Sequence, residues 1–155
     1  MIRPSRISFG GTAAIVTSMA LITGLDAAHA GKTSIVSALL IAAVADNLTD
    51  SLSVHMYQES ERREPREVFV GTLANFGTRL LVCLSFVLMV ALLPERVARV
   101  WGLVWGAILL VVLTYALARY RRVGTLPEIA KHLGAALVIV LVSKRVGQWI
   151  AAHVI

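Results

Sequence analysis

The amino-acid sequence predicts an all-α fold, a polytopic membrane helix bundle with five transmembrane helices in a single domain of residues 1–155. Of its 155 residues, 57% are hydrophobic and only 15% are charged, and the mean hydropathy is +0.78. A soluble domain of this size does not need so much apolar sequence. The apolar residues also fall into five stretches, each near the roughly 20 residues with which a helix crosses a bilayer. We expect spans at approximately residues 10–28, 34–57, 68–93, 100–117 and 133–155.

Short polar breaks separate these spans. The first break is residues 29–33, which contain no proline. Pro94 and Pro127 mark the last two breaks, because proline cannot continue the hydrogen-bond ladder of a helix.

The first stretch has a second interpretation as a cleaved secretory signal, because two arginines, an apolar run at residues 13–25 and Ala28-His29-Ala30 match its three regions. Asp26 and three hydroxyl residues make a poor apolar core for such a signal. We therefore expect the segment to be kept as the first span, whereas cleavage would leave four spans. The three hydroxyl residues are Thr17, Ser18 and Thr23.

The Lys and Arg residues of the predicted loops are unevenly distributed, with nine on one side and three on the other. Positive loops are retained in the cytoplasm, so we expect a cytoplasmic N-terminus and an outside C-terminus, in a bacterial inner (plasma) membrane. The net charge of +6 then reflects membrane orientation, and we expect no nucleic-acid partner. The nine are Arg3, Arg6, Arg62, Arg63, Arg66, Arg119, Arg121, Arg122 and Lys131, and the three are Lys32, Arg96 and Arg99.

A polar stripe crosses the second span at hydrocarbon depth. Asp46 and Asp50 are four residues apart and share one helix face, with Asn47 beside them. Carboxylates at this depth are costly and are functional-site candidates by default. Their oxygens suit a divalent cation such as Mn(II) or Fe(II), and they can equally relay protons. We therefore predict a metal site of Asp46, Asp50 and Asn47, on a stripe that continues to Ser53 and Tyr57.

Four residues are candidate supporting or proton-linked groups: Asp26, Ser53, His55 and Glu59. Ser53 shares the stripe, and His55 and Glu59 stand four apart at the predicted cytoplasmic mouth, where they can exchange protons. That spacing alone is a weak metal signal. Ser51 and His55 fall farther round the helix and would join the aspartates only through a bend or a neighbouring chain. Asp26 lies near the outer end, where a solvated carboxylate is expected.

Arg79, Lys144 and Arg145 lie inside predicted spans and are possible charge partners for the intramembrane acids. Three acids, counting Asp26, against three bases permit complete neutralisation. This balance supports an alternative function as a non-transporting membrane scaffold or accessory subunit, held together by interhelical ion pairs.

Small residues predict close helix contacts. Gly102 and Gly106 are spaced as in a GxxxG motif, which a second copy can use, so we expect a homodimer. The lone Cys83 excludes an internal disulfide. The sequence contains no nucleotide loop, nucleophile–base arrangement or cofactor motif, so we expect neither an enzyme nor a tightly bound cofactor. A second small-residue face on the third span comprises Gly71, Ala74, Asn75 and Thr78.

Three segments resemble the vacuolar iron transporter family: ALITGL at residues 20–25, LIAAVA at 40–45 and LSVHMYQESE at 52–61. The resemblance implies five spans, a cytoplasmic N-terminus, a dimer, and export of Fe(II) or Mn(II) from the cytosol in exchange for protons.

The chain departs from the family pattern at three places. An expected pathway aspartate falls near Ala13-Ala14, and a pathway methionine falls at Asp50, which makes the site richer in oxygen. The family's iron-loading helices have no counterpart in the short connection of residues 58–67. The chain therefore resembles a divergent, minimal member.

Overall fold

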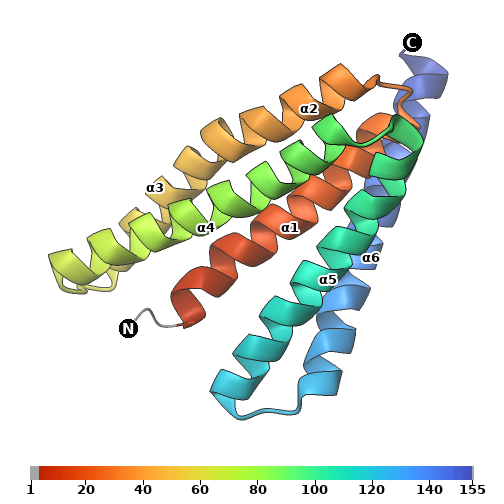
Figure 1. The fold of residues 1–155 in the computed structure, drawn as a ribbon. Coiled ribbons are helices and arrows are strands. Elements are labelled where there is room, and N and C mark those ends of the chain that lie inside the picture. Colours follow the sequence, from red (N-terminus) through yellow and green to blue (C-terminus); the bar gives the residue numbers. More distant parts are fainter. Residues whose placement is uncertain (1–3, 155) are drawn as a thin grey trace.

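The computed structural model describes residues 4–154, and Figure 1 shows them as a bundle of helices joined by short turns. No strand occurs among these residues, so the all-α prediction is confirmed. The helices are α1 (Pro4–Ala27), α2 (Lys32–Ile41), the π-helical turn η1 (Ala42–Asp46), α3 (Asn47–Ser60), α4 (Pro65–Leu92), α5 (Glu95–Arg121) and α6 (Thr125–His153).

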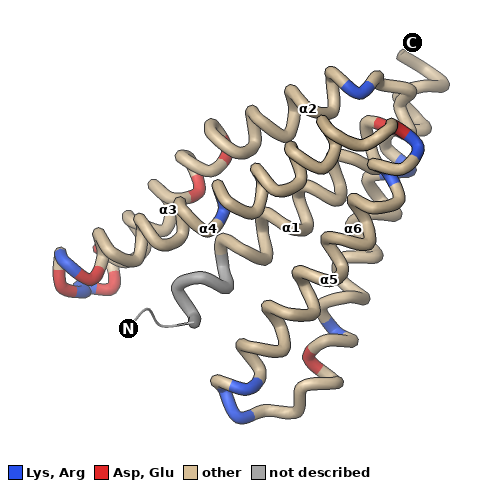
Figure 2. The backbone as a smooth tube through the Cα atoms, viewed as in Figure 1, with Lys and Arg blue, Asp and Glu red and all other residues tan. Residues whose placement is uncertain are grey.

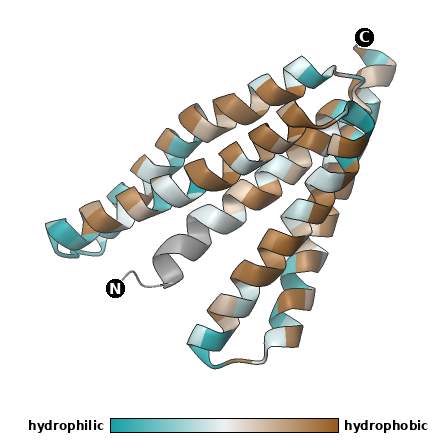
Figure 3. Cartoon of the chain, in the orientation of Figure 1, coloured by the Kyte–Doolittle hydropathy of each residue, from teal (hydrophilic) through white to brown (hydrophobic). Residues whose placement is uncertain are grey.

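Five helical segments of the described chain are long and apolar enough to cross a membrane, with α2, η1 and α3 forming one of them. Figure 3 shows apolar residues along much of α2, α4 and α5 and polar residues at the α3–α4 and α5–α6 turns. The chain is therefore an integral membrane protein. The last two helices begin earlier than predicted, and Pro127 lies within the first turn of α6 rather than in a break. Proline fits there because first-turn N–H groups have no partner within the helix.

Helix α1 occupies the centre of the bundle and packs against α2, α4, α5 and α6. Its buried Ile15, Met19 and Ile22 form the main core together with residues such as Phe86 and Leu110. The first span is thus the helix around which the other four assemble.

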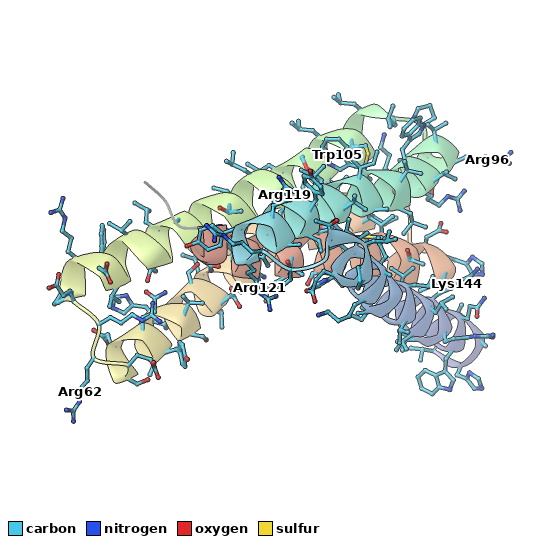
Figure 4. The ribbon with its side chains drawn as sticks, turned by 90° about the horizontal axis from the view of Figure 1, so that it is seen from below. Arg62, Arg96, Trp105, Arg119, Arg121 and Lys144 are labelled. Atoms are coloured by element: carbon cyan, nitrogen blue, oxygen red, sulfur yellow. The ribbon has the colours of Figure 1, made fainter. Side chains whose placement is uncertain are left out.

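The bundle is narrow at one end and open at the other (Figure 1). At the narrow end, the Lys32 ammonium donates to the Leu93 carbonyl at 3.0 Å and ties the start of α2 to the end of α4. At the open end, the α3–α4 turn lies apart from the α5–α6 turn. Figure 4 places Arg62 and Arg96 at opposite ends, and the start of α1 and the end of α6 likewise lie at opposite ends, as an odd number of spans requires.

Three helices end in turns that place a non-glycine residue in the left-handed region: His29, Arg62 and Arg122, with φ of 58°, 53° and 55°. After α1, the Ala30 N–H donates to the Leu25 carbonyl at 2.9 Å, the bond of a Schellman motif. These caps allow the chain to reverse within a few residues.

The two glycines predicted as a possible dimer surface face the inside of this chain. A Cβ on Gly102 would contact Ile22, and one on Gly106 would overlap Met19. These glycines let α5 approach α1 and are not free for a second copy, which corrects the use suggested by their spacing. On its other side, α5 is held to α4 by the Trp105 indole N–H, which donates to the Ser85 hydroxyl at 3.0 Å.

Candidate ion-binding site in the second span

The π-helical turn η1 sets the orientation of the second span. Its hydrogen bonds span five residues rather than four, which lowers the rotation per residue locally. Buried residues recur at every fourth position through this turn. In an unbroken α-helix, each step of four residues turns by about 400°, so such a row would drift round the helix by about 40° per step and leave the face that packs on the bundle. The row comprises Ile35, Leu39, Ala43, Asn47 and Ser51.

A single arginine of α4 binds both aspartates of the polar stripe. Arg79 donates through Nη2 to Asp46 Oδ2, and its Nη1 lies 3.2 Å from Asp50 Oδ2. Figure 2 shows the two acidic positions facing a basic position on α4. The Arg79 side chain is only 4% exposed, whereas Asp50 is 23% and Asp46 is 53% exposed. With all three groups ionised, this Asp46–Arg79–Asp50 triad carries one net negative charge.

Asn75, one turn before Arg79 on α4, joins the triad to a second polar residue of α3. Its Nδ2 is 3.2 Å from Asp50 Oδ2 and 3.4 Å from the Ser51 hydroxyl. The Asn75 Oδ1 and Arg79 Nε atoms are buried and have no hydrogen-bond partner among the described residues. Gly10 of α1 lies so close to Asn75 that any side chain there would overlap the amide. The backbone of α1 therefore closes the inner side of the site.

Asn47, predicted as a third metal ligand, has a different environment. It is fully buried, its Nδ2 donates to the Phe76 carbonyl at 3.0 Å, and its Oδ1 accepts from Ser51 at 3.4 Å. Both ends of the amide are thus used in holding α3 against α4. The prediction of Asn47 as a metal ligand is not supported by this geometry.

His55 and Glu59 continue the polar contacts toward the α3–α4 turn. His55 Nδ1 lies 3.2 Å from the Thr72 hydroxyl of α4, and His55 Nε2 lies 3.4 Å from Glu59 Oε1. Ser51 and His55, which a regular helical wheel turns away from the site, thus face α4 within a single chain. Ser53 and Tyr57, which the same wheel groups with the aspartates, are exposed on the outer face, and the Ser53 hydroxyl bonds the Thr49 carbonyl.

The remaining predicted charges are not part of this site. Asp26 at the narrow end is paired with Arg99, whose Nη1 lies 2.6 Å from Asp26 Oδ1. Lys144 and Arg145 on α6 are exposed, and neither has an acidic partner among residues 4–154. The predicted pairing of the intramembrane aspartates with an arginine is thus found for Arg79 only. Within this chain, Lys144 and Arg145 do not neutralise the aspartates of the second span, because α6 packs on α1 and α5, on the other side of the bundle.

No group of three or more His, Cys, Asp or Glu side chains in the described part of the chain could hold a metal ion. One of the two carboxylates can accept a proton while the other stays paired with Arg79. Arg79 contacts the Oδ2 atom of each aspartate, so a cation that binds either of these oxygens must displace Arg79 from it.

The sequence predicts Asn75 as part of a small-residue packing face. In the structure its amide instead bonds both Asp50 and Ser51, and so links the aspartate stripe of the second span to its buried row. A signal was present, because an amide four residues before a buried arginine places both on one face of the third span. Comparisons with protein-family models, curated proteins and solved structures found no match to this chain.

Proposed function

We propose that this protein is a membrane ion transporter that exchanges protons for a cation at Asp46 and Asp50. The observation that carries the proposal is the charge of the triad, two carboxylates on one guanidinium. A net negative charge at hydrocarbon depth is costly unless a proton or a cation neutralises it. The cation implied by the resemblance to vacuolar iron transporters is Fe(II) or Mn(II), whose preference for oxygen ligands suits the two aspartates.

A polar column between α3 and α4 supports proton coupling. It begins at Asp50, continues through Asn75 and Ser51, and resumes with His55 and Glu59 near the α3–α4 turn. Histidine changes its charge near physiological pH and is a common proton carrier. In this proposal, His55 and Glu59 carry protons between the triad and the membrane surface at the α3–α4 turn.

Arg79 acts in this proposal as a tethered counter-ion. Its guanidinium neutralises one carboxylate while the site holds no other cation, and it yields Asp46 when a cation binds there. Asp46 is the position that exchanges more easily, because its side chain is half exposed, whereas Asp50 has both Arg79 and Asn75 as partners.

A homodimer completes the proposed site. The Asp46 side chain is half exposed, and Ser53 and Tyr57 of the same stripe are exposed as well. A half-exposed carboxylate against lipid is unfavourable, so a second copy covering this face would bring two triads together and would supply further oxygen ligands. Native mass measurement in mild detergent should give the dimer mass, and a monomer alone would contradict this part of the proposal.

The proposed direction of transport combines the proposed orientation with the export implied by the resemblance to vacuolar iron transporters. A cytoplasmic N-terminus places the α3–α4 turn in the cytoplasm of a bacterial cell and the narrow end outside the inner membrane. Metal would then leave the cytosol as protons enter.

A second candidate, the non-transporting scaffold, is favoured by one observation. Arg79 is buried and bonds both aspartates across two helices, which is also how an ion pair fixes the register of a bundle. The uncompensated charge of the triad argues against this candidate, because a purely structural group needs only one acid for each base.

Flux into liposomes separates the two candidates. The purified chain is reconstituted with an internal metal-sensitive dye and a pH-sensitive dye, and Mn(II), Fe(II) or a pH step is applied outside. We expect metal entry coupled to proton movement, strongly reduced by Asp46→Asn and by Asp50→Asn. Asp26→Asn is the matched control, since Asp26 has its own arginine and lies outside the triad, and it should retain flux. Absence of any metal or proton flux in the unmodified protein would refute transport and leave the scaffold.

A further inference from the structure

A cavity of about 810 Å³ lies between α1, α5 and α6 at the narrow end of the bundle. Its floor is apolar and includes Leu103, Leu137 and Val140. Leu137 and Leu141 of α6 line it and are both more than half exposed, so the cavity is open on this side. In a bilayer, the floor is therefore accessible to hydrocarbon from the side.

The polar rim of the cavity carries one unbalanced positive charge. Asp26 and Arg99 both line it and neutralise each other at 2.6 Å. Lys144 also lines it, is exposed, and has no acidic partner among residues 4–154. His29, the remaining ionisable rim residue, adds a positive charge only when protonated.

Lys144 lies closer to the membrane centre than the end of the neighbouring helix α1. The Ser143 hydroxyl donates to the Ala20 carbonyl at 2.6 Å, and Gly147 packs directly on Gly24. Lys144 is thus level with residue 21 of α1, six residues before that helix ends. At the rise per residue of an α-helix, six residues correspond to roughly 9 Å. A lysine at this depth extends its ammonium toward the headgroup region. Figure 4 shows Lys144 at the same end of the bundle as Arg96.

We propose that this cavity binds an anionic phospholipid, with its phosphate on Lys144 and an acyl chain along the apolar floor. Charge complementarity selects this occupant, because the only unneutralised ionised group on the described rim is a cation and the floor opens to hydrocarbon. The same positive charge repels Fe(II), Mn(II) and other cations, so the cavity is not the exit of the proposed ion pathway. Asp26 does not oppose phosphate binding, because Arg99 already neutralises it.

Native mass spectrometry tests this site with a defined probe. The full chain is released from micelles containing equal amounts of phosphatidylglycerol and phosphatidylcholine, and bound lipid is counted for each variant. We expect the unmodified chain to retain more phosphatidylglycerol, and Lys144→Ala to lower that preference about fivefold, the factor for one basic side chain near an anionic lipid surface. Lys144→Arg should keep it. Arg145→Ala is the matched control, since Arg145 is also exposed but does not line the cavity.

A second pair of variants tests the apolar floor. Leu137→Trp should fill part of the cavity and lower lipid retention, whereas Val138→Trp, on the neighbouring exposed position outside the cavity, should not. Equal loss from Lys144→Ala and Arg145→Ala would overturn the proposal, since retention would then reflect general surface charge. Displacement of the phospholipid by excess glycerol phosphate would also overturn it, because the site would then bind a soluble phosphate rather than a lipid.

Discussion

Stepwise neutralisation of the triad should reveal that both aspartates stabilise the same arginine. Asp46→Asn leaves Arg79 with Asp50 as counter-ion, and Asp50→Asn leaves it with Asp46. Each single change loses a contact with Arg79 but also removes the excess negative charge of the triad, so the net cost should be small. We expect at most about 1 kcal/mol for the half-exposed Asp46 and at most about 1.5 kcal/mol for Asp50, whose charged carboxylate also accepts from Asn75. The double variant leaves a buried guanidinium with neither carboxylate, which should cost about 5 kcal/mol.

Thermal unfolding in mild detergent measures this non-additivity. For a chain of this length, about 1 kcal/mol corresponds to a change of about 2–4 °C in Tm, so each single variant should lose at most a few degrees. The double variant should lose about 10–20 °C by the same conversion. Adding Arg79→Met to the double variant removes the buried charge and should restore most of the loss, because an apolar side chain replaces an ion.

The triple variant also separates stability from function. It should fold and yet carry no cation, so its liposomes should show no flux. If the double variant loses only the sum of the two single losses, or if Arg79→Met restores nothing, then Arg79 is not the shared partner. Asp26→Asn controls for the general cost of removing a carboxylate from an arginine, because its pair with Arg99 involves only one acid.

Three further outcomes are expected from the fold. Gly147→Ala should lower Tm by several degrees, because its Cβ would overlap the Gly24 carbonyl oxygen, whereas Gly134→Ala on the same helix meets nothing within 4 Å and should be neutral or stabilising. Arg62→Gly should raise Tm slightly, because glycine adopts the left-handed cap conformation at φ 53° without steric cost. In a background lacking the native cysteine, a cysteine at Arg96 should react with an impermeant thiol reagent added to intact cells, and one at Arg62 should not. The reverse labelling would contradict the proposed cytoplasmic N-terminus.

The spans could be predicted because bilayer thickness fixes both the length and the polarity of a crossing helix. The sequence predicts a break at Pro127, whereas α6 already begins at Thr125, because a proline in the first turn of a helix breaks no hydrogen bond. The candidate acids were predictable for a similar reason, since carboxylates at positions 46 and 50 stand out against their apolar surroundings.

The rotation of the second span could not be predicted from a helical wheel. A wheel assumes 100° per residue, and the π turn ending at Asp46 departs from that value just before the site. The wheel correctly groups Asp46 with Ser53 on one stripe, but it does not say which stripe faces α4. Asn47 and Ser51 face α4 instead, because Asn75 and the Phe76 carbonyl provide the hydrogen-bond partners there.

The choice among Arg79, Lys144 and Arg145 as charge partner also required the tertiary structure. All three lie inside apolar stretches, so the sequence pattern does not show which of them pairs with the aspartates. The packing of α4 beside α3 brings Arg79 to the aspartates, whereas α6 contacts α1 and α5. Hydropathy fixes how deep a charge lies in the membrane, but it carries no information about which helix stands beside it.

The two aspartates are unequal, and this inequality decides how the triad can exchange its charge. Asp50 accepts from both Arg79 and Asn75, while Asp46 has Arg79 alone and is half exposed. Protonation of Asp46 therefore disrupts fewer contacts and leaves Arg79 paired with Asp50 as a neutral group. A metal ion that coordinates Asp46 Oδ2 must instead compete with the guanidinium for that oxygen. In the proposed function, proton binding and metal binding are therefore alternatives at Asp46 Oδ2, which is the condition for exchanging one for the other.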